Sequence, residues 1–269
     1  MEKLTLEESK TYQLGILDSI DTFCKLNGIR YSIAYGTLLG AVRHHGFIPW
    51  DDDIDIVMPR EDYSRFVSQY QDNHYVLLTG DKIANHLHVV VTDPSTFVEF
   101  KPGTSDALFY RGGVWVDVFP LDYVSKNEEK FELQKRQIAK RRILQRYGEI
   151  SPVNSSDGGI RKAFKLIIHK FLSLLVALNG KASLKLMKKY NDENTGKVAN
   201  LAVWYLKTNK AVPSEWFEQY VTLDFEGRKY QSISHYHDYL ASLYGDYMKL
   251  PPPAEQVPKH SYTAYKLEK

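Results

Sequence analysis

The chain has 269 residues, of which 43% are hydrophobic and 25% charged, a composition typical of a globular protein with one large domain or two small ones. Its single cysteine, Cys24, excludes an internal disulfide and a zinc site built from several cysteines. No apolar run approaches the roughly 18 residues that a membrane span requires, and acidic residues follow Met1 where a signal peptide would carry its apolar run. We therefore expect a cytoplasmic protein.

The spacing of apolar residues predicts a succession of short elements. In chain order we expect a helix at 4–26, a strand at 31–35, a short helix at 38–42, a strand at 54–58 and a helix at 61–70. Gly28 should end the first helix, because glycine readily adopts the left-handed conformation of a C-terminal turn. Further strands are expected at 75–78, 86–91, 96–100 and 114–119, and further helices at 126–147, 161–178, 181–190 and 234–244.

Strands gathered in the first half, with helices after them, predict an α/β or α+β fold. The core would be a mixed sheet with flanking helices and a basic helical elaboration. We expect three segments packed into one unit, at residues 1–125, 126–195 and 196–269.

Charge is unevenly distributed along these segments, although the formal net charge is only +2. Residues 126–190 contain 16 Lys and Arg against 5 Asp and Glu, whereas the rest of the chain contains 19 against 28. A basic segment joined to an acidic remainder indicates contact with an anionic surface or polymer. A solvated helical face would carry the same charges, and the sequence does not decide between the two interpretations.

Four aspartates occupy five positions around the start of the strand predicted at 54–58: Asp51, Asp52, Asp53 and Asp55. Carboxylates crowded at the start of a buried strand need something to offset their repulsion, and a hard divalent cation is the usual solution. Alternate residues of a strand face the same side, so Asp53 and Asp55 should share a face, with Cα atoms roughly 6–7 Å apart. We predict that these two hold a metal, that Asp51 is a substrate contact, and that Asp52 points the other way.

Asp117 is the candidate for a third carboxylate, because apolar residues flank it on both sides within the strand predicted at 114–119. A charge inside such a strand is costly unless something pairs with it. Alternatively, Asp51 and Asp52 cap a turn, and Asp53 and Asp55 are solvated at a sheet edge. A calcium-binding EF-hand loop is excluded, because Ile56 stands where that loop requires glycine.

Phosphate contacts are predicted just upstream of the aspartates. Gly36 and Thr37, at a strand-to-helix junction, could offer backbone N–H groups and a hydroxyl to a phosphate, and Arg43 could add a charge from the short helix. Trp115 should face the same side as Asp117, and an aromatic ring beside a carboxylate suits a quaternary ammonium group. A tryptophan of the core would fit the same position. We interpret His86 and His88 as structural, since no third metal ligand stands near them.

Several blocks of the sequence resemble the LicD family: residues 36–44, residues 46–56 with Met58-Pro-Arg, residues 116–122, and residues 244–252 with His260. The resemblance runs from about residue 30 to residue 260 and is most specific in the first two blocks. It implies a nucleotidyltransferase-like fold and a metal-dependent transferase that moves phosphocholine from CDP-choline to a sugar hydroxyl. The implied acceptors are teichoic-acid precursors or lipopolysaccharide.

Carried over to this chain, the resemblance makes Asp53 and Asp55 the paired metal ligands and Asp117 the third acidic position, with Mg²⁺ or Mn²⁺ as the cofactor. It leaves open whether Asp117 is a metal ligand or a proton acceptor, and whether one ion or two are bound. Gly36 and Thr37 match the glycine–small-residue element of the wider superfamily. Two features depart from the pattern of that superfamily: Thr37 replaces the usual small residue, and the spacing to Asp53 is longer.

The activated alcohol is not determined by these blocks, because the related fukutin family transfers ribitol phosphate from CDP-ribitol. CDP-glycerol is a further alternative donor. A different class of function, a non-catalytic choline-binding protein that uses its aromatic residues, would require no metal. For an enzyme with any of these donors, we expect a glycan or lipid-linked glycan as the acceptor and no nucleic-acid partner. We also expect the basic segment to contact the inner face of the membrane.

Overall fold

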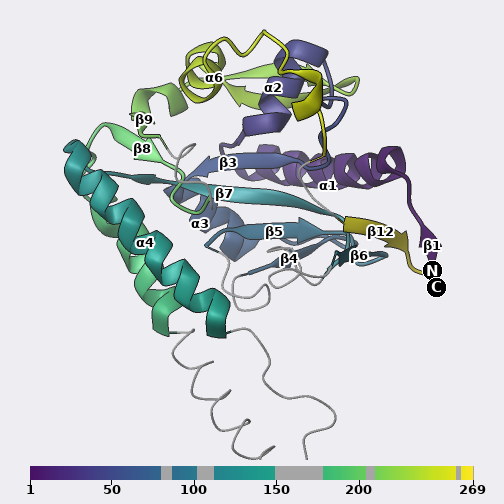
Figure 1. Ribbon diagram of the computed structural model, residues 1–269, viewed down its shortest axis with the longest axis horizontal. Coiled ribbons are helices and arrows are strands. Elements are labelled where there is room, and N and C mark those ends of the chain that lie inside the picture. Colours follow the sequence, from purple (N-terminus) through teal and green to yellow (C-terminus); the bar gives the residue numbers. More distant parts are fainter. Residues whose placement is uncertain (80–86, 102–111, 149–177, 204–209, 259–261, 269) are drawn as a thin grey trace, which may run out of the picture.

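The computed structural model of the chain describes residues 1–79, 87–101, 112–148, 178–203, 210–258 and 262–268, with the side chains of 142–148 left out (Figure 1). The predicted helix at 161–178 lies outside the described residues except for its last position. Among the described residues, no helix is both long and apolar enough to cross a lipid bilayer.

Helices and strands alternate irregularly along the chain. The first half contains β1 (Glu2–Lys3), α1 (Leu6–Asn27), β2 (Ser32–Ile33), α2 (Tyr35–His44), β3 (Asp55–Pro59), α3 (Arg60–Gln69), β4 (Val76–Leu78), β5 (Val89–Thr92), β6 (Thr96–Phe100) and β7 (Trp115–Tyr123). The second half contains α4 (Glu128–Gly148), a helix whose described part covers 178–187, β8 (Lys197–Ala199), β9 (Val212–Pro213), β10 (Tyr220–Phe225), β11 (Arg228–Ile233), α6 (Tyr236–Tyr244) and β12 (Tyr262–Lys266). Single turns of 3-10 helix lie at Lys188–Tyr190, Ser214–Phe217 and Pro253–Glu255.

The main sheet has the order β2-β3-β7-β5-β4, with β8 and β9 extending it from the end of β7. Only β3 and β7 run parallel in this sheet; the other pairs are antiparallel. The mixed sheet with its helices confirms the predicted α/β (α+β) class. A second sheet, β1-β12-β6, joins the two ends of the chain, which lie side by side in Figure 1.

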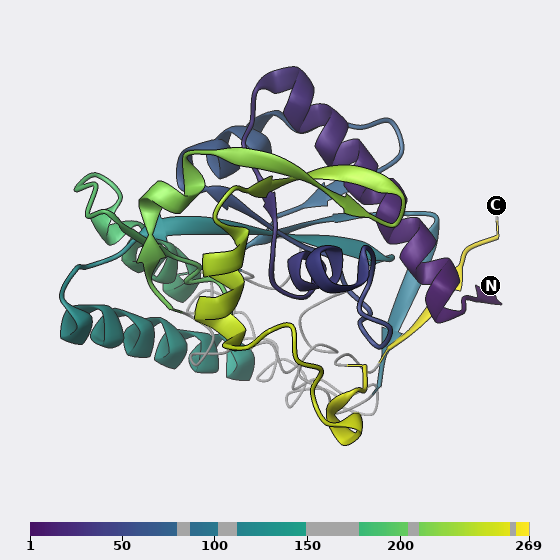
Figure 2. The same cartoon turned by 90° about the horizontal axis from the view of Figure 1, so that it is seen from above.

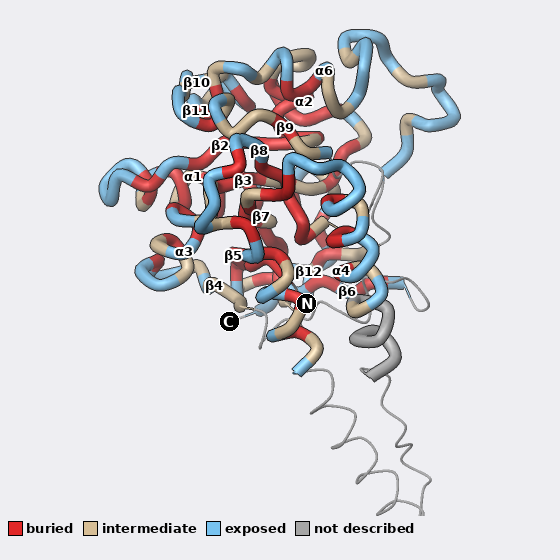
Figure 3. The backbone as a smooth tube through the Cα atoms, turned by 90° about the vertical axis from the view of Figure 1, so that its left-hand side faces the viewer, coloured by how far each residue is buried: buried red, intermediate tan, exposed pale blue. Residues whose placement is uncertain are grey.

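The helices α1 and α3 lie on one side of the main sheet and α4 lies on the other (Figures 1 and 2). The core is concentrated in β3, β5 and β7, whose residues are mostly buried (Figure 3). Gly28 ends α1 in the left-handed conformation with φ 57°, as predicted. Thr5 and Glu8 form a reciprocal capping box at its start.

The end of β7 is fixed by a buried ion pair. Arg60, at the start of α3, donates from Nε and Nη2 to the two carboxylate oxygens of Asp122, at 2.7 and 2.5 Å. Asn191 donates to the same carboxylate at 2.7 Å. Asp122 is fully buried, so these donors compensate for its desolvation. They tie α3 and the segment after residue 190 to the central parallel strand pair.

Candidate active site

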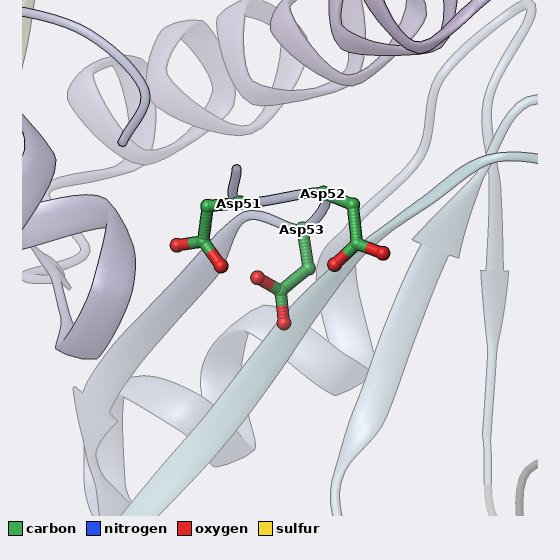
Figure 4. A group of neighbouring side chains, drawn as sticks. All are labelled: Asp51, Asp52 and Asp53. Carbon is green, nitrogen blue, oxygen red and sulfur yellow. The ribbon is translucent and has the colours of Figure 1, made fainter. Parts of the chain in front are cut away.

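Residues 51–54 form a loop between α2 and β3, which we call the acidic loop. The carboxylates of Asp51, Asp52 and Asp53 converge, with one oxygen of each lying within 4.8 Å of the others (Figure 4). Asp51 and Asp52 are each only 4% exposed. Three largely shielded carboxylates at this spacing are a donor set that suits a hard divalent cation, which takes oxygen ligands.

The position of Asp52 differs from the prediction. Strand alternation would turn its side chain away from Asp51 and Asp53, but the structure groups the three together. The physical reason is that β3 begins only at Asp55, so the residues before it do not follow the alternation of a pleated strand.

Asp55 and Asp117 lie opposite each other on the parallel strands β3 and β7, where their Cα atoms are register partners. The backbone N–H of Asp117 also donates to the carbonyl of Ile54 at 2.9 Å. The pairing of β3 with β7 therefore places Asp117 directly beside the end of the acidic loop. It brings Asp55 and Asp117 together on paired strands, with Asp53 in the loop just before β3. The metal-binding roles of these three aspartates stay predictions.

Two aromatic rings orient the carboxylate of Asp117. The indole N–H of Trp115 donates to Oδ2 at 2.7 Å, and Nε2 of His88 lies 2.8 Å from Oδ1. Trp115 is 5% exposed and packs against Phe100 and Tyr262. The structure thus gives Trp115 a contact with Asp117, and its predicted contact with a substrate stays a prediction.

The structure places His88 at the site, although the sequence interpretation left it out. His88 immediately precedes β5, and the pairing of β5 with β7 brings it beside Asp117, a contact between distant residues that no local pattern of the sequence indicates. The other histidine of that interpretation, His86, lies outside the described residues.

Gly36 and Thr37, at the start of α2, contact the aspartates themselves. A Cβ atom on Gly36 would lie 2.3 Å from Oδ2 of Asp51, so only glycine leaves room for that carboxylate. Asp51 therefore lies against the N-terminal end of α2, where negative charge is favoured. The hydroxyl of buried Thr37 accepts a 2.9 Å hydrogen bond from the backbone N–H of Asp55. The predicted contacts of both residues with a phosphate stay predictions.

Arg43 is near the other end of α2 and holds the segment after α6. Its Nη1 donates to the carbonyl of Tyr247 at 2.8 Å, and its Nε donates to Nε2 of His44 at 2.9 Å. The guanidinium thus has a structural use, and its predicted contact with phosphate stays a prediction.

Two tyrosines that the sequence interpretation did not select lie near the aspartates. Burial raises the pKa of the Tyr35 phenol, and the charge of Asp55 adds to the effect. Partial desolvation raises the pKa of Tyr244 as well, although the residue is 37% exposed, and the charges of Asp55 and Asp51 add to the effect. Both phenols therefore stay protonated at neutral pH and can donate hydrogen bonds. Tyr35 also has a φ of 48°, unusual for a bulky residue and a form of strain that concentrates at functional sites.

Comparison with known proteins matches residues 28–144 to the family described as LicD/FKTN/FKRP, nucleotidyltransferase domain. In an alignment of 273 residues, the chain is 34% identical to the lipopolysaccharide cholinephosphotransferase LicD of Haemophilus influenzae. The alignment covers 98% of this chain and 99% of that protein. A shorter stretch of 57 residues is 40% identical to the human ribitol 5-phosphate transferase FKRP, covering 21% of this chain and 10% of that protein. The matched family domain contains the acidic loop, β3 and β7.

Proposed function

This chain belongs to the LicD family, and we propose that it transfers phosphocholine from CDP-choline to a hydroxyl group of a cell-surface glycan precursor, with release of CMP. The observation that carries the proposal is the similarity to a cholinephosphotransferase along essentially the whole of both chains. The acidic loop with its partner strand β7 supports a phosphoryl-transfer site, because such sites work by positioning and charge stabilisation.

The carboxylates fit a divalent cation, Mg²⁺ or Mn²⁺, because oxygen ligands at the observed spacing are the donors that such ions prefer. Asp53 is the residue common to the convergent group and to the predicted set of Asp53, Asp55 and Asp117. A bound ion would neutralise the diphosphate of CDP-choline and stabilise charge on the transferred group.

The remaining chemistry belongs to the chain. The acceptor hydroxyl oxygen forms a bond to the phosphorus that carries choline, the bond from that phosphorus to the bridging oxygen breaks, and CMP leaves with the electron pair. The hydroxyl proton must pass to a base. Trp115 and His88 contact separate oxygens of Asp117 and fix its orientation, which supports the role of metal ligand over that of base.

The acceptor class that we propose is a precursor of lipopolysaccharide or teichoic acid, in free or lipid-linked form. A lipid-linked acceptor would bring the enzyme to the inner face of the membrane. The part of the protein that we propose to contact the lipid surface is the basic segment 126–190, whose described helices are α4 and the helix at 178–187. Ribitol phosphate transfer is the second candidate function, favoured by the local similarity to FKRP.

A screen of CDP-alcohols tests the function. Purified protein is incubated with CDP-choline, CDP-ribitol or CDP-glycerol, with and without Mg²⁺ and a glycan acceptor, and CMP is measured. We expect metal-dependent CMP release, with CDP-choline as the preferred donor. Preference for CDP-ribitol would replace the donor, whereas absence of CMP release from all donors with every acceptor would favour a non-catalytic choline-binding protein.

Asp53 provides the test of the metal site. We expect Asp53→Asn to lower kcat/KM by about 100- to 1000-fold, since losing a metal ligand removes several kcal/mol of transition-state stabilisation. Asp224→Asn is the control, because Asp224 pairs with Lys229 on an exposed strand. Full activity of Asp53→Asn would contradict the assignment.

A further inference from the structure

One backbone carbonyl of the acidic loop accepts hydrogen bonds from two side chains, one near each end of the chain. The carbonyl oxygen of Asp52 accepts a 2.9 Å hydrogen bond from Nε2 of Gln13 and a 3.0 Å hydrogen bond from the hydroxyl of Tyr262. Gln13 lies on α1 and Tyr262 begins β12. We propose that Gln13 and Tyr262 are positioning residues that fix the acidic loop for metal binding, an inference that rests on the proposed function.

The Asp52 carbonyl matters because the peptide unit is planar. Fixing this oxygen sets the plane that joins Asp52 to Asp53, and so the direction in which the Asp53 side chain leaves the backbone. The loop precedes β3, and backbone hydrogen bonds fix its two ends: the N–H of Asp51 donates to the carbonyl of Ile48, and the carbonyl of Ile54 accepts from the N–H of Asp117. The side chains of Gln13 and Tyr262 hold the carbonyl between these ends.

Gln13 is an unfavourable residue for stability at its position. It is fully buried, and its Oε1 has no hydrogen-bond partner among the described residues. A buried acceptor without a partner opposes folding, so an apolar side chain of similar length would suit the packing of α1 at least as well. The benefit of glutamine here is the bond to the acidic loop, which points to a role in the site.

Tyr262 is suited to act as the second donor. Its ring packs against Trp115, with centroids 5.3 Å apart, so the ring that donates to the loop touches the residue that orients Asp117. The hydroxyl of Tyr262 lies 3.0 Å from the carbonyl oxygen of Asp52, and because a carbonyl can only accept, the hydroxyl is the donor of this hydrogen bond.

Four single variants test the proposal: Gln13→Met, Tyr262→Phe, Tyr265→Phe and Asp53→Asn. Gln13→Met removes the donor and the unpaired acceptor together, and Tyr262→Phe removes only a hydroxyl. Tyr265→Phe is the matched control on the same strand, because the hydroxyl of Tyr265 contacts only exposed Glu99 in the described structure. Mn²⁺ affinity is measured by electron paramagnetic resonance without substrate, beside thermal unfolding and turnover.

We expect Gln13→Met and Tyr262→Phe each to weaken Mn²⁺ binding by about tenfold, the effect typical of groups that orient metal ligands. The melting temperature of Gln13→Met should be unchanged or higher, and Tyr265→Phe should match the parent protein. Unchanged Mn²⁺ affinity in both variants, or a loss matched by lower thermal stability, would overturn the positioning role. Parent-like Mn²⁺ binding and turnover in Asp53→Asn would instead overturn the metal site itself, which distinguishes the two failures.

Discussion

Asp117 shows how a single carboxylate can be prepared for chemistry by its neighbours. An indole N–H and an imidazole nitrogen contact its two oxygens separately, at 2.7 and 2.8 Å. A carboxylate accepts and does not donate, so Nε2 of His88 must carry the hydrogen when Asp117 is ionised. The two rings prevent rotation of the carboxylate, and the oxygen lone pairs that remain keep a fixed direction.

Trp115→Phe tests this orientation. Phenylalanine preserves an aromatic ring beside Phe100 and Tyr262 but cannot donate to Asp117. We expect kcat/KM for CMP release to fall by about tenfold, because loss of a group that orients a ligand has effects of this size. Trp216→Phe is the control, since Trp216 stacks with His235 instead. Equal activity of the two variants would show that the indole N–H has no role in the reaction.

At the scale of elements, α2 and the acidic loop are fitted to each other through Gly36. Ala at this position would place its Cβ 2.3 Å from the carboxylate of buried Asp51, and one of the two must move. We expect Gly36→Ala to lower turnover by at least about tenfold, because displacement of Asp51 disturbs the group of carboxylates. CMP release and Mn²⁺ affinity measure the effect.

Gly15→Ala is the matched control for this substitution. Both glycines lie in helices, but the new Cβ of Gly15→Ala would meet only the hydroxyl end of the Tyr75 side chain, which can move. Alanine is also the better helix former, so this variant should keep full activity. If Gly36→Ala is as active as Gly15→Ala, the contact with Asp51 is not required.

The elements that the sequence predicted well are those defined by local signals. Apolar spacing and Gly28 located α1, and apolar runs located β3 and β7 to within a few residues. The hairpin β10–β11 was not predicted, because its turn has Glu226 at φ 53° before Gly227, where asparagine or aspartate is usual. Distant contacts hold Glu226 there: its N–H donates to the carbonyl of His45, and its carboxylate accepts from the N–H of Phe47.

The candidate site was predictable in part, because some of its residues also carry a local signal in the sequence. Asp117 was selected because it interrupts an apolar strand, and the structure pairs that strand with β3 at Asp55. The grouping of Asp52 with its neighbours depends on where β3 begins, and the contacts of Gln13 and Tyr262 join residues far apart in sequence. No local pattern could have indicated them.

At the scale of the whole molecule, basic charge is concentrated on α4 and the helix at 178–187. Gln134 of α4 donates to the carbonyl of Leu186, and Arg141 contacts Asn179, so the two helices lie together. The exposed residues of these helices and of the 3-10 turn after the second helix include many lysines and arginines: Lys130, Arg136, Lys140, Lys181, Lys185, Lys188 and Lys189. Leu133 and Leu184 are exposed among them, at 55% and 39%. Exposed leucines between cations suit an anionic lipid surface better than a nucleic acid, because leucine can enter the interface between headgroups and acyl chains.

We therefore expect the protein to bind vesicles that contain anionic lipid, and to release them as salt rises. Replacing Lys181, Lys185 and Lys188 with Gln should weaken binding by about a hundredfold, at roughly 1 kcal/mol for each charge near the surface. The control replaces Lys3, Lys229 and Lys266, which are also exposed, with Gln. Cosedimentation with vesicles of mixed anionic and neutral lipid measures both. Equal loss of vesicle binding in the two triple variants would mean that the net charge of the protein attracts the membrane. If only the Lys181, Lys185 and Lys188 variant loses binding, and its CMP release in solution is unchanged, the membrane contact lies on the surface that carries these lysines.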